Sequence, residues 1–157
     1  MKTRIAVLLF AAAVAAVAQS SNGYIFVAPG GLTSNGYTSG TIQAGGGLDA
    51  VLYKGAGINL ELGALGPRDC LSCTVGLFSA GGVYYFLHSK DSRIAPFVDG
   101  GYSLMFRTGH LNLGYFGGGV NLWPVHHVGL RLELRDHVNA SFGTIHYWGF
   151  RIGLALR

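Results

Sequence analysis

Charged residues are scarce in this sequence. Lys, Arg, Asp and Glu make up 11% of its 157 residues, less than half of the roughly one quarter that is typical of soluble domains. Such scarcity is expected of a chain that turns much of its surface away from water. Without Lys2 and Arg4 the formal charge falls from +4 to +2, which is too weak and too scattered for a nucleic-acid surface. We therefore expect no nucleic-acid partner.

A long apolar run is also absent beyond the first eighteen residues, so no helical membrane anchor is expected in the body of the chain. The N-terminal segment has basic residues at Lys2 and Arg4, an apolar run over residues 5–17, and small residues up to Ala18. This order is typical of a secretory signal peptide. We expect residues 1–18 to be the signal peptide and residues 19–157 to form one domain. An uncleaved anchor fits less well because the run is short.

Cysteine occurs only twice, as Cys70 and Cys73. No histidine follows the pair, as haem attachment would require, and no second pair completes a zinc site. A local disulfide fits an oxidising compartment better than a redox-active pair or two free thiols. The ring it closes is so short that the bond would stiffen its loop rather than stabilise the whole fold.

Helical periodicity is missing as well, because no segment spaces its apolar residues by three and four. Turn-forming clusters instead divide the chain into segments rich in β-formers. We predict eight strands, at residues 23–28, 40–53, 56–66, 74–87, 94–106, 110–123, 128–138 and 145–157. Most reach the roughly 9–11 residues that a tilted strand needs to cross a bilayer, whereas soluble strands usually have about five or six.

The predicted connections fall into two sets. With a secreted N-terminus, the connections at residues 54–55, 88–93 and 124–127 are expected to face the periplasm. The other four, at residues 29–39, 67–73, 107–109 and 139–144, are then expected to face outside the cell. Bacterial barrels tend to pair short periplasmic turns with longer external loops.

Polarity alternates along most of the predicted strands. Leu130, Leu132 and Leu134 alternate with charged residues, and the same period of two runs through residues 40–53, 56–66, 94–106 and 145–157. A soluble β-sandwich would expose the charged face to water, whereas a membrane barrel exposes the apolar face to lipid. We favour the membrane barrel. The segments 74–87 and 110–123 are apolar on both faces and cannot be oriented from the sequence.

With the apolar face toward lipid, seven charged residues share the enclosed face: Asp49, Glu61, Asp99, Arg131, Glu133, Arg135 and Arg151. Four acids against three bases can pair, and a guanidinium can bridge two carboxylates. An eight-stranded barrel is just wide enough for its own side chains to fill it. We expect a structural network in a filled lumen, with a narrow polar pathway for small solutes as the alternative. The glycines expected on the same face would make room for the arginines: Gly45, Gly47, Gly101, Gly149 and Gly153.

Aromatic residues gather near the predicted strand ends. Such residues favour the bilayer interface, where a ring can lie among the headgroups. The expected belts are Tyr53, Tyr84, Tyr85, Phe86 and Trp123 on the periplasmic side, and Phe106, Tyr147 and Trp148 on the outer side.

The stretches at residues 130–137 and 146–154 are similar to the closing hairpin of the small eight-stranded outer-membrane β-barrel family, represented by the transmembrane domain of outer membrane protein A. The resemblance spans residues 23–157. It implies an all-β, eight-stranded antiparallel up-and-down transmembrane barrel in the bacterial outer membrane. It also implies contact with outer-membrane lipid and with the barrel-assembly machinery during insertion. It implies little about activity, because the family includes adhesins, stabilisers and enzymes.

We expect no enzymatic activity, no cofactor and no metal, and a structural role or one exerted through external loops whose partner the sequence does not identify. One alternative is a soluble secreted barrel that binds an apolar ligand. Another is an outer-membrane lipid hydrolase, because His137, Asn139 and Ser141 lie near a strand end beside His146. Lipid A deacylases of similar fold carry a serine two residues after the catalytic histidine, and here that position is Asn139.

Overall fold

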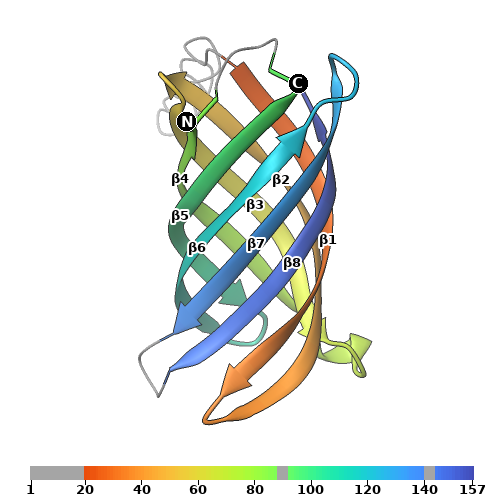
Figure 1. The fold of residues 1–157 in the computed structure, drawn as a ribbon. Coiled ribbons are helices and arrows are strands. Elements are labelled where there is room, and N and C mark those ends of the chain that lie inside the picture. Colours follow the sequence, from red (N-terminus) through yellow and green to blue (C-terminus); the bar gives the residue numbers. More distant parts are fainter. Residues whose placement is uncertain (1–19, 88–91, 140–143) are drawn as a thin grey trace, which may run out of the picture.

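The computed structural model describes residues 20–87, 92–139 and 144–157, which form a closed barrel (Figure 1). Every strand pairs antiparallel with the next, and β1 also pairs with β8. The predicted fold class, an all-β eight-stranded antiparallel up-and-down barrel, is confirmed. A short 3₁₀ turn, η1 (Leu71–Cys73), lies between β3 and β4. The strands are β1 (Ser20–Ser34), β2 (Tyr37–Tyr53), β3 (Ala56–Pro67), β4 (Val75–Tyr85), β5 (Ile94–Phe106), β6 (His110–Leu122), β7 (Val128–Asn139) and β8 (Ile145–Leu156).

Within these ranges, no helix is long and apolar enough to cross a membrane. The expected signal peptide, residues 1–18, lies outside the described part of the chain.

The first hairpin is longer than predicted. The sequence places a loop at residues 29–39, but β1 continues to Ser34 and β2 already begins at Tyr37. Asn35 and Gly36 form the whole turn, with φ of 50° and 83°, as two-residue hairpin turns of the Asn-Gly kind require. Pro29 is tolerated because no pairing with β8 occurs at residues 28 and 29, so its missing N–H is not needed there.

The two strands that the sequence could not orient have clear faces in the structure. On β4, Ser79 and Tyr85 point inward, and on β6, Tyr115 does, whereas Phe78 and Phe116 point outward. Both faces of these strands are apolar because the lumen holds apolar layers as well as charged ones.

Two aromatic residues assigned to the belts do not belong to them. Tyr85 on β4 and Trp123 just after β6 are buried inside the barrel, and they belong to the two segments whose faces the sequence did not reveal. Tyr147 is half-buried and packs against an inner apolar cluster. The other five residues of the expected belts are exposed: Tyr53, Tyr84, Phe86, Phe106 and Trp148.

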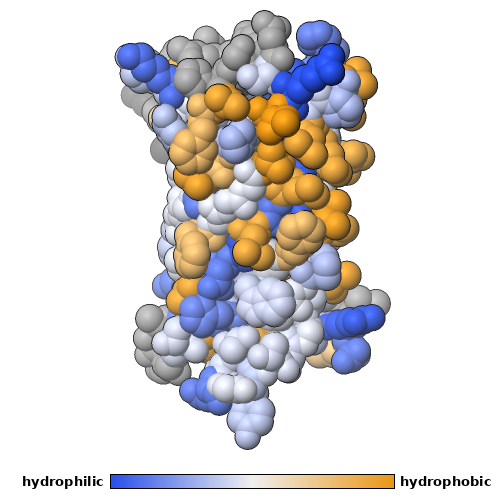
Figure 2. Space-filling model, in the orientation of Figure 1, coloured by the Kyte–Doolittle hydropathy of each residue, from blue (hydrophilic) through white to orange (hydrophobic). Residues whose placement is uncertain are grey.

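The outer wall is apolar. Ile25 on β1, Leu62 on β3 and Phe116 on β6 each expose more than 60% of their surface. In the view of Figure 2, hydrophobic colours gather on the upper and middle wall, and white and blue cover the lower end. The molecule therefore presents an apolar band between its ends.

The lumen is layered along the barrel axis, and β5 shows the order. From the end that holds the chain termini, its inward residues are Ala95 and Phe97, then Asp99, then Ser103, then Met105. Phe97 belongs to an apolar cluster with Val51, Val83, Trp123 and Ala155. Met105 belongs to a second cluster with Leu65, Leu77 and Leu113 near the opposite end. The charged residues lie between the two clusters.

Candidate functional site

Seven charged side chains lie together inside the barrel, and none is more than 7% exposed. They are the seven that share the enclosed phase in the sequence: Asp49 on β2, Glu61 on β3, Asp99 on β5, Arg131, Glu133 and Arg135 on β7, and Arg151 on β8. Alternate residues of a strand point to the same side of a sheet, so closure of the barrel brings these positions face to face.

Glu61 joins strands from both halves of the chain. Its two carboxylate oxygens accept hydrogen bonds from Nη1 and Nη2 of Arg151, at 2.6 and 2.9 Å. This two-point geometry is the strong form of the arginine–carboxylate pair. Arg135 Nη1 donates to the same carboxylate at 3.2 Å, and so does the Tyr24 hydroxyl at 2.9 Å. One side chain on β3 thus connects to β1, β7 and β8.

Glu133 lies between two arginines of its own strand. Arg131 Nε donates to one carboxylate oxygen at 3.0 Å, and Arg135 Nε donates to the other at 2.5 Å. These residues are neighbours because side chains two positions apart on a strand share a face. Arg131 also donates from Nη1 to Asp49 at 2.8 Å.

The cluster has one more acid than it has arginines. Arg135 Nη2 donates to Asp99 Oδ2, but Asp99 Oδ1 has no hydrogen-bond partner in the described part of the chain. Four carboxylates against three guanidinium groups leave one formal negative charge, and the carboxylate atom without a partner is on Asp99.

Aromatic rings support the arginines. The Arg131 guanidinium lies between the rings of Tyr24 and Phe97, 4.1 and 4.0 Å from their centres. Arg151 lies 4.2 Å from the centre of the Phe26 ring. Contacts of this kind attract a cation to the ring face, and more strongly where water is excluded.

Two glycines make room for these rings. A Cβ atom on Gly47 would lie 2.6 Å from the Tyr24 hydroxyl oxygen, and one on Gly45 would lie 3.2 Å from Phe26. The sequence predicts that inward glycines accommodate arginines directly. In the structure Gly45 and Gly47 accommodate the rings, and the arginines stack on those rings.

The sequence prediction of the charged cluster omitted several polar side chains that hydrogen-bond to it. Asp49 also accepts from Asn59 Nδ2 at 2.5 Å and from the Tyr85 hydroxyl at 2.6 Å. Asn121 Nδ2 donates to the Tyr85 hydroxyl at 3.1 Å. The alternation of β3 could have identified Asn59, since it shares the phase of Glu61. Tyr85 and Asn121 lie on the strands whose faces the sequence did not reveal.

The histidine considered as a catalytic base points into the lumen. His137 is 2% exposed, and its Nδ1 lies 3.1 Å from Ser103 Oγ. Asn139 is also buried, and Ser141 lies outside the described residues. Among the residues that the structure describes, no three His, Cys, Asp or Glu side chains gather to hold a metal ion.

The cysteine pair lies in the connection between β3 and β4, at the end opposite the chain termini. Cys70 and Cys73 are joined by a disulfide bond. Arg107 from the β5–β6 turn donates to the Ser72 carbonyl at 2.7 Å, so this loop is tied to its neighbour.

No family model matches the chain, and no curated protein matches it. Solved structures do match. Neisserial surface protein A aligns with a TM-score of 0.66 at 10% identity, over 87% of this chain and 96% of its own. The N-terminal β-barrel domain of OprF from Pseudomonas aeruginosa aligns with a TM-score of 0.62 at 13% identity, over 87% and 98%. A de novo designed transmembrane β-barrel aligns with a TM-score of 0.57 at 16% identity, over 86% and 93%. The chain has the fold of the small outer-membrane β-barrels.

Proposed function

We propose that this protein is an integral β-barrel of the bacterial outer membrane, with a closed lumen and a structural role or one exerted through its external loops. The observation that carries the proposal is the distribution of the two faces. Arg131, Arg135 and Arg151 are 1% exposed, whereas large apolar side chains cover the outside. A water-soluble barrel would bury the apolar face and leave the charged face in solvent.

The interior argues for a closed lumen. Each guanidinium group contacts carboxylates and at least one ring. The charged layer therefore has few polar groups that could bind a solute passing through the lumen. Apolar clusters lie on both sides of this layer. The proposed role of Asp49, Glu61, Asp99, Arg131, Glu133, Arg135 and Arg151 is to hold the strands together from inside.

The proposed location in the outer membrane requires export of the chain and its insertion into that membrane. Residues 1–18 are proposed as the signal peptide, and the barrel-assembly machinery as the partner during insertion. Outer-membrane lipid is the proposed surrounding of the apolar band. The proposal includes no cofactor, metal or enzymatic reaction.

Site-directed fluorescence tests the membrane placement. Leu62→Cys lies in the apolar band, and Tyr37→Cys lies at the tip of the first hairpin, where Tyr37 is 83% exposed. Each is made in a background with Cys70 and Cys73 replaced by serine, labelled with an environment-sensitive fluorophore and refolded into vesicles. We expect lipid-confined quenchers to act at position 62, and water-soluble quenchers at position 37.

A monomer that stays soluble without detergent, with position 62 open to the water-soluble quencher, would contradict the placement. It would favour a soluble barrel instead.

A further inference from the structure

The two ends of the barrel differ in charge. At the end that holds the chain termini, three basic side chains form what is called here the basic rim: Lys54 in the β2–β3 turn, Arg93 just before β5 and Arg157 just after β8. Outside the lumen, no Asp or Glu lies at this end in the part of the chain that the structure describes. Residues 88–91, outside that part, contain one Lys and one Asp, whose formal charges cancel.

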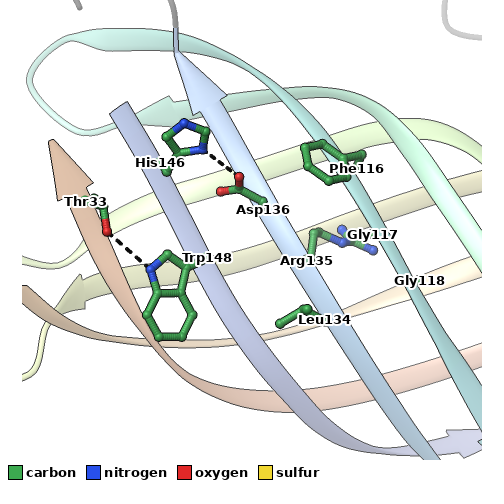
Figure 3. A pocket seen from close by; sticks show the side chains of 9 residues that line it. All are labelled: Thr33, Phe116, Gly117, Gly118, Leu134, Arg135, Asp136, His146 and Trp148. Carbon is green, nitrogen blue, oxygen red and sulfur yellow. Dashed lines mark hydrogen bonds and ion pairs between the residues drawn. The ribbon is translucent and has the colours of Figure 1, made fainter. Parts of the chain in front are cut away.

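At the opposite end the charges are balanced. Arg68 and Arg107 lie there among the described residues, and so do Asp69 and Asp136. Asp136 Oδ2 also lies 2.7 Å from His146 Nδ1, a contact between β7 and β8 that Figure 3 shows. The excess of basic over acidic side chains on the surface is therefore confined to the end with the termini.

The basic rim borders the apolar wall directly. Each of its residues is next in sequence to an exposed apolar or aromatic residue: Lys54 follows Tyr53, Arg93 precedes Ile94 and Arg157 follows Leu156. The Lys54 Nζ atom lies 5.1 Å from the centre of the Tyr53 ring. In Figure 2, strongly hydrophilic side chains at the upper end lie beside the hydrophobic wall. Long basic side chains in this position reach headgroup level while their neighbours contact hydrocarbon.

Two of the three cations are not neutralised by the protein. Lys54 and Arg93 are exposed, and no ion pair between described residues involves either of them. Arg157 is partly engaged, because its guanidinium lies 4.4 Å from the centre of the Trp123 ring and its Nε donates to the His126 carbonyl. Lys54 and Arg93 thus present their charge to the surroundings of the barrel.

A cationic rim at headgroup level discriminates among phospholipids by charge. Basic side chains beside a bilayer surface attract anionic lipids, and the attraction acts within a Debye length. A zwitterionic headgroup brings its own cation toward the rim together with its phosphate. A headgroup such as glycerol leaves the phosphodiester as the only charge, so its attraction to Lys54 and Arg93 is not offset.

We propose that the basic rim binds the headgroups of anionic phospholipids of the phosphatidylglycerol kind, in the leaflet that surrounds the end with the termini. In the orientation expected from the sequence, this is the periplasmic leaflet of the outer membrane. The inference rests on the membrane placement proposed above and adds to it a lipid preference that is confined to one end of the barrel.

A tryptophan placed between two of the cations can report on this preference. Phe86 is exposed on the wall, and the backbone of residues 85–86 hydrogen-bonds to Gly55 on one side and to Pro96 on the other. Position 86 therefore lies between the turn that holds Lys54 and the start of β5. The reporter protein carries Phe86→Trp and Trp148→Phe. The remaining Trp123 is buried in the lumen.

The reporter protein is refolded into phosphatidylcholine vesicles that contain a small fraction of one lipid brominated near the headgroup end of its acyl chains, either phosphatidylglycerol or phosphatidylcholine. We expect phosphatidylglycerol to be enriched about three-fold over phosphatidylcholine at position 86, equivalent to about 0.7 kcal/mol. The unmodified protein, whose exposed Trp148 lies near the other end, should show no enrichment. Both leaflets have the same composition, so the direction of insertion does not affect the comparison.

Variants and salt locate the effect. Lys54→Gln combined with Arg93→Gln should abolish the enrichment at position 86. Arg68→Gln, which removes an exposed cation at the opposite end, is the matched control and should leave it intact. Circular dichroism verifies folding. Raising the salt concentration shortens the Debye length from about 10 Å at 0.1 M to about 3 Å at 1 M, and it should abolish the enrichment without any change at the rim.

Equal quenching by the two lipids at position 86, the same enrichment at Trp148, or enrichment that persists in the double variant or at 1 M salt would overturn the lipid preference and leave the membrane placement standing. Equal quenching together with sedimentation on isolated peptidoglycan that depends on Lys54 and Arg93 would overturn it in favour of the cell-wall polymer. Absence of quenching by both brominated lipids would overturn the placement itself.

Discussion

At the residue scale, Glu61 is the side chain on which the interior depends most directly. It accepts hydrogen bonds from Arg135, Arg151 and Tyr24, which lie on three other strands. Breaking a buried ion pair by removing one partner costs about 3–5 kcal/mol. Here Arg151 would lose its two-point carboxylate partner, although the cluster as a whole would then hold three acids for three arginines. An exposed loop carboxylate such as Asp69 carries no comparable cost.

We therefore expect Glu61→Gln to lower the free energy of unfolding by about 3 kcal/mol, because the amide keeps the shape of the side chain and loses its charge. Urea unfolding of the protein in lipid vesicles, followed by tryptophan fluorescence, measures the change. Asp69→Asn is the control and should stay within about 0.5 kcal/mol of the unmodified protein. Similar values for the two variants would show that the buried cluster does not stabilise the fold.

The sequence predicts which charged side chains point into the lumen, but it does not predict which acid pairs with which arginine. Period-two alternation placed Glu133 and Arg151 on one side of their strands, because large apolar residues alternate there with charged residues around Glu133 and with small residues around Arg151. Which acid meets which arginine depends on strand register and on closure of the barrel. Arg131 lies between Tyr24 and Phe97, which are far from it in sequence.

At the element scale, the β1–β2 hairpin shows both what local sequence determines and how it can be misinterpreted. Pro29, Gly30 and Gly31 are typical of a loop, yet all three lie in β1. The turn is instead set by Asn35 and Gly36, both with positive φ. Strand β5 ended where predicted, because polar turn residues bound it on both sides. The turn-forming pair Asn35 and Gly36 therefore indicated the end of the strand better than the strand-breaking residues at 29–31 did.

We expect Gly36→Ala to loosen the hairpin tip while the rest of the barrel stays intact. A Cβ at this position meets no atom within 4 Å, but its φ of +83° is strained for alanine, at a cost of about 1 kcal/mol. Hydrogen exchange of the hairpin amides should become about five-fold faster, as measured by mass spectrometry.

Gly109→Ala is the matched control for this variant, since a Cβ there also meets open space and Gly109 lacks a positive φ. Equal exchange rates in the two variants would contradict the assignment of the tip to a strained two-residue turn.

At the scale of the whole molecule, the order of the layers determines what can pass through the barrel. A hydrated ion would have to cross the cluster of Leu65, Leu77 and Leu113, then the paired charges, then the cluster that contains Phe97 and Trp123. The first cluster offers no polar side chain to replace lost hydration, and in the second the hydroxyls of Tyr24 and Tyr85 already donate to Glu61 and Asp49.

We accordingly expect the purified protein to produce no stable ion conductance in planar bilayers. The control is the same amount of urea-unfolded protein, which tests for leakage caused by addition of the chain. Reproducible, long-lived conductance steps from folded protein would contradict the closed lumen and favour the narrow polar pathway.

The pairing of β1 with β8, from Gly23 with Leu156 to Ser34 with Ile145, also makes the fold indivisible. The barrel closes only when β1 pairs with β8. Because these are the first and last strands, closure requires every strand between them to be present. Until that step, two strand edges carry unpaired N–H and C=O groups, which hydrocarbon does not tolerate. In the proposed membrane placement, closure and entry into the bilayer are therefore one event, and a chain that lacks β1 or β8 cannot close the barrel.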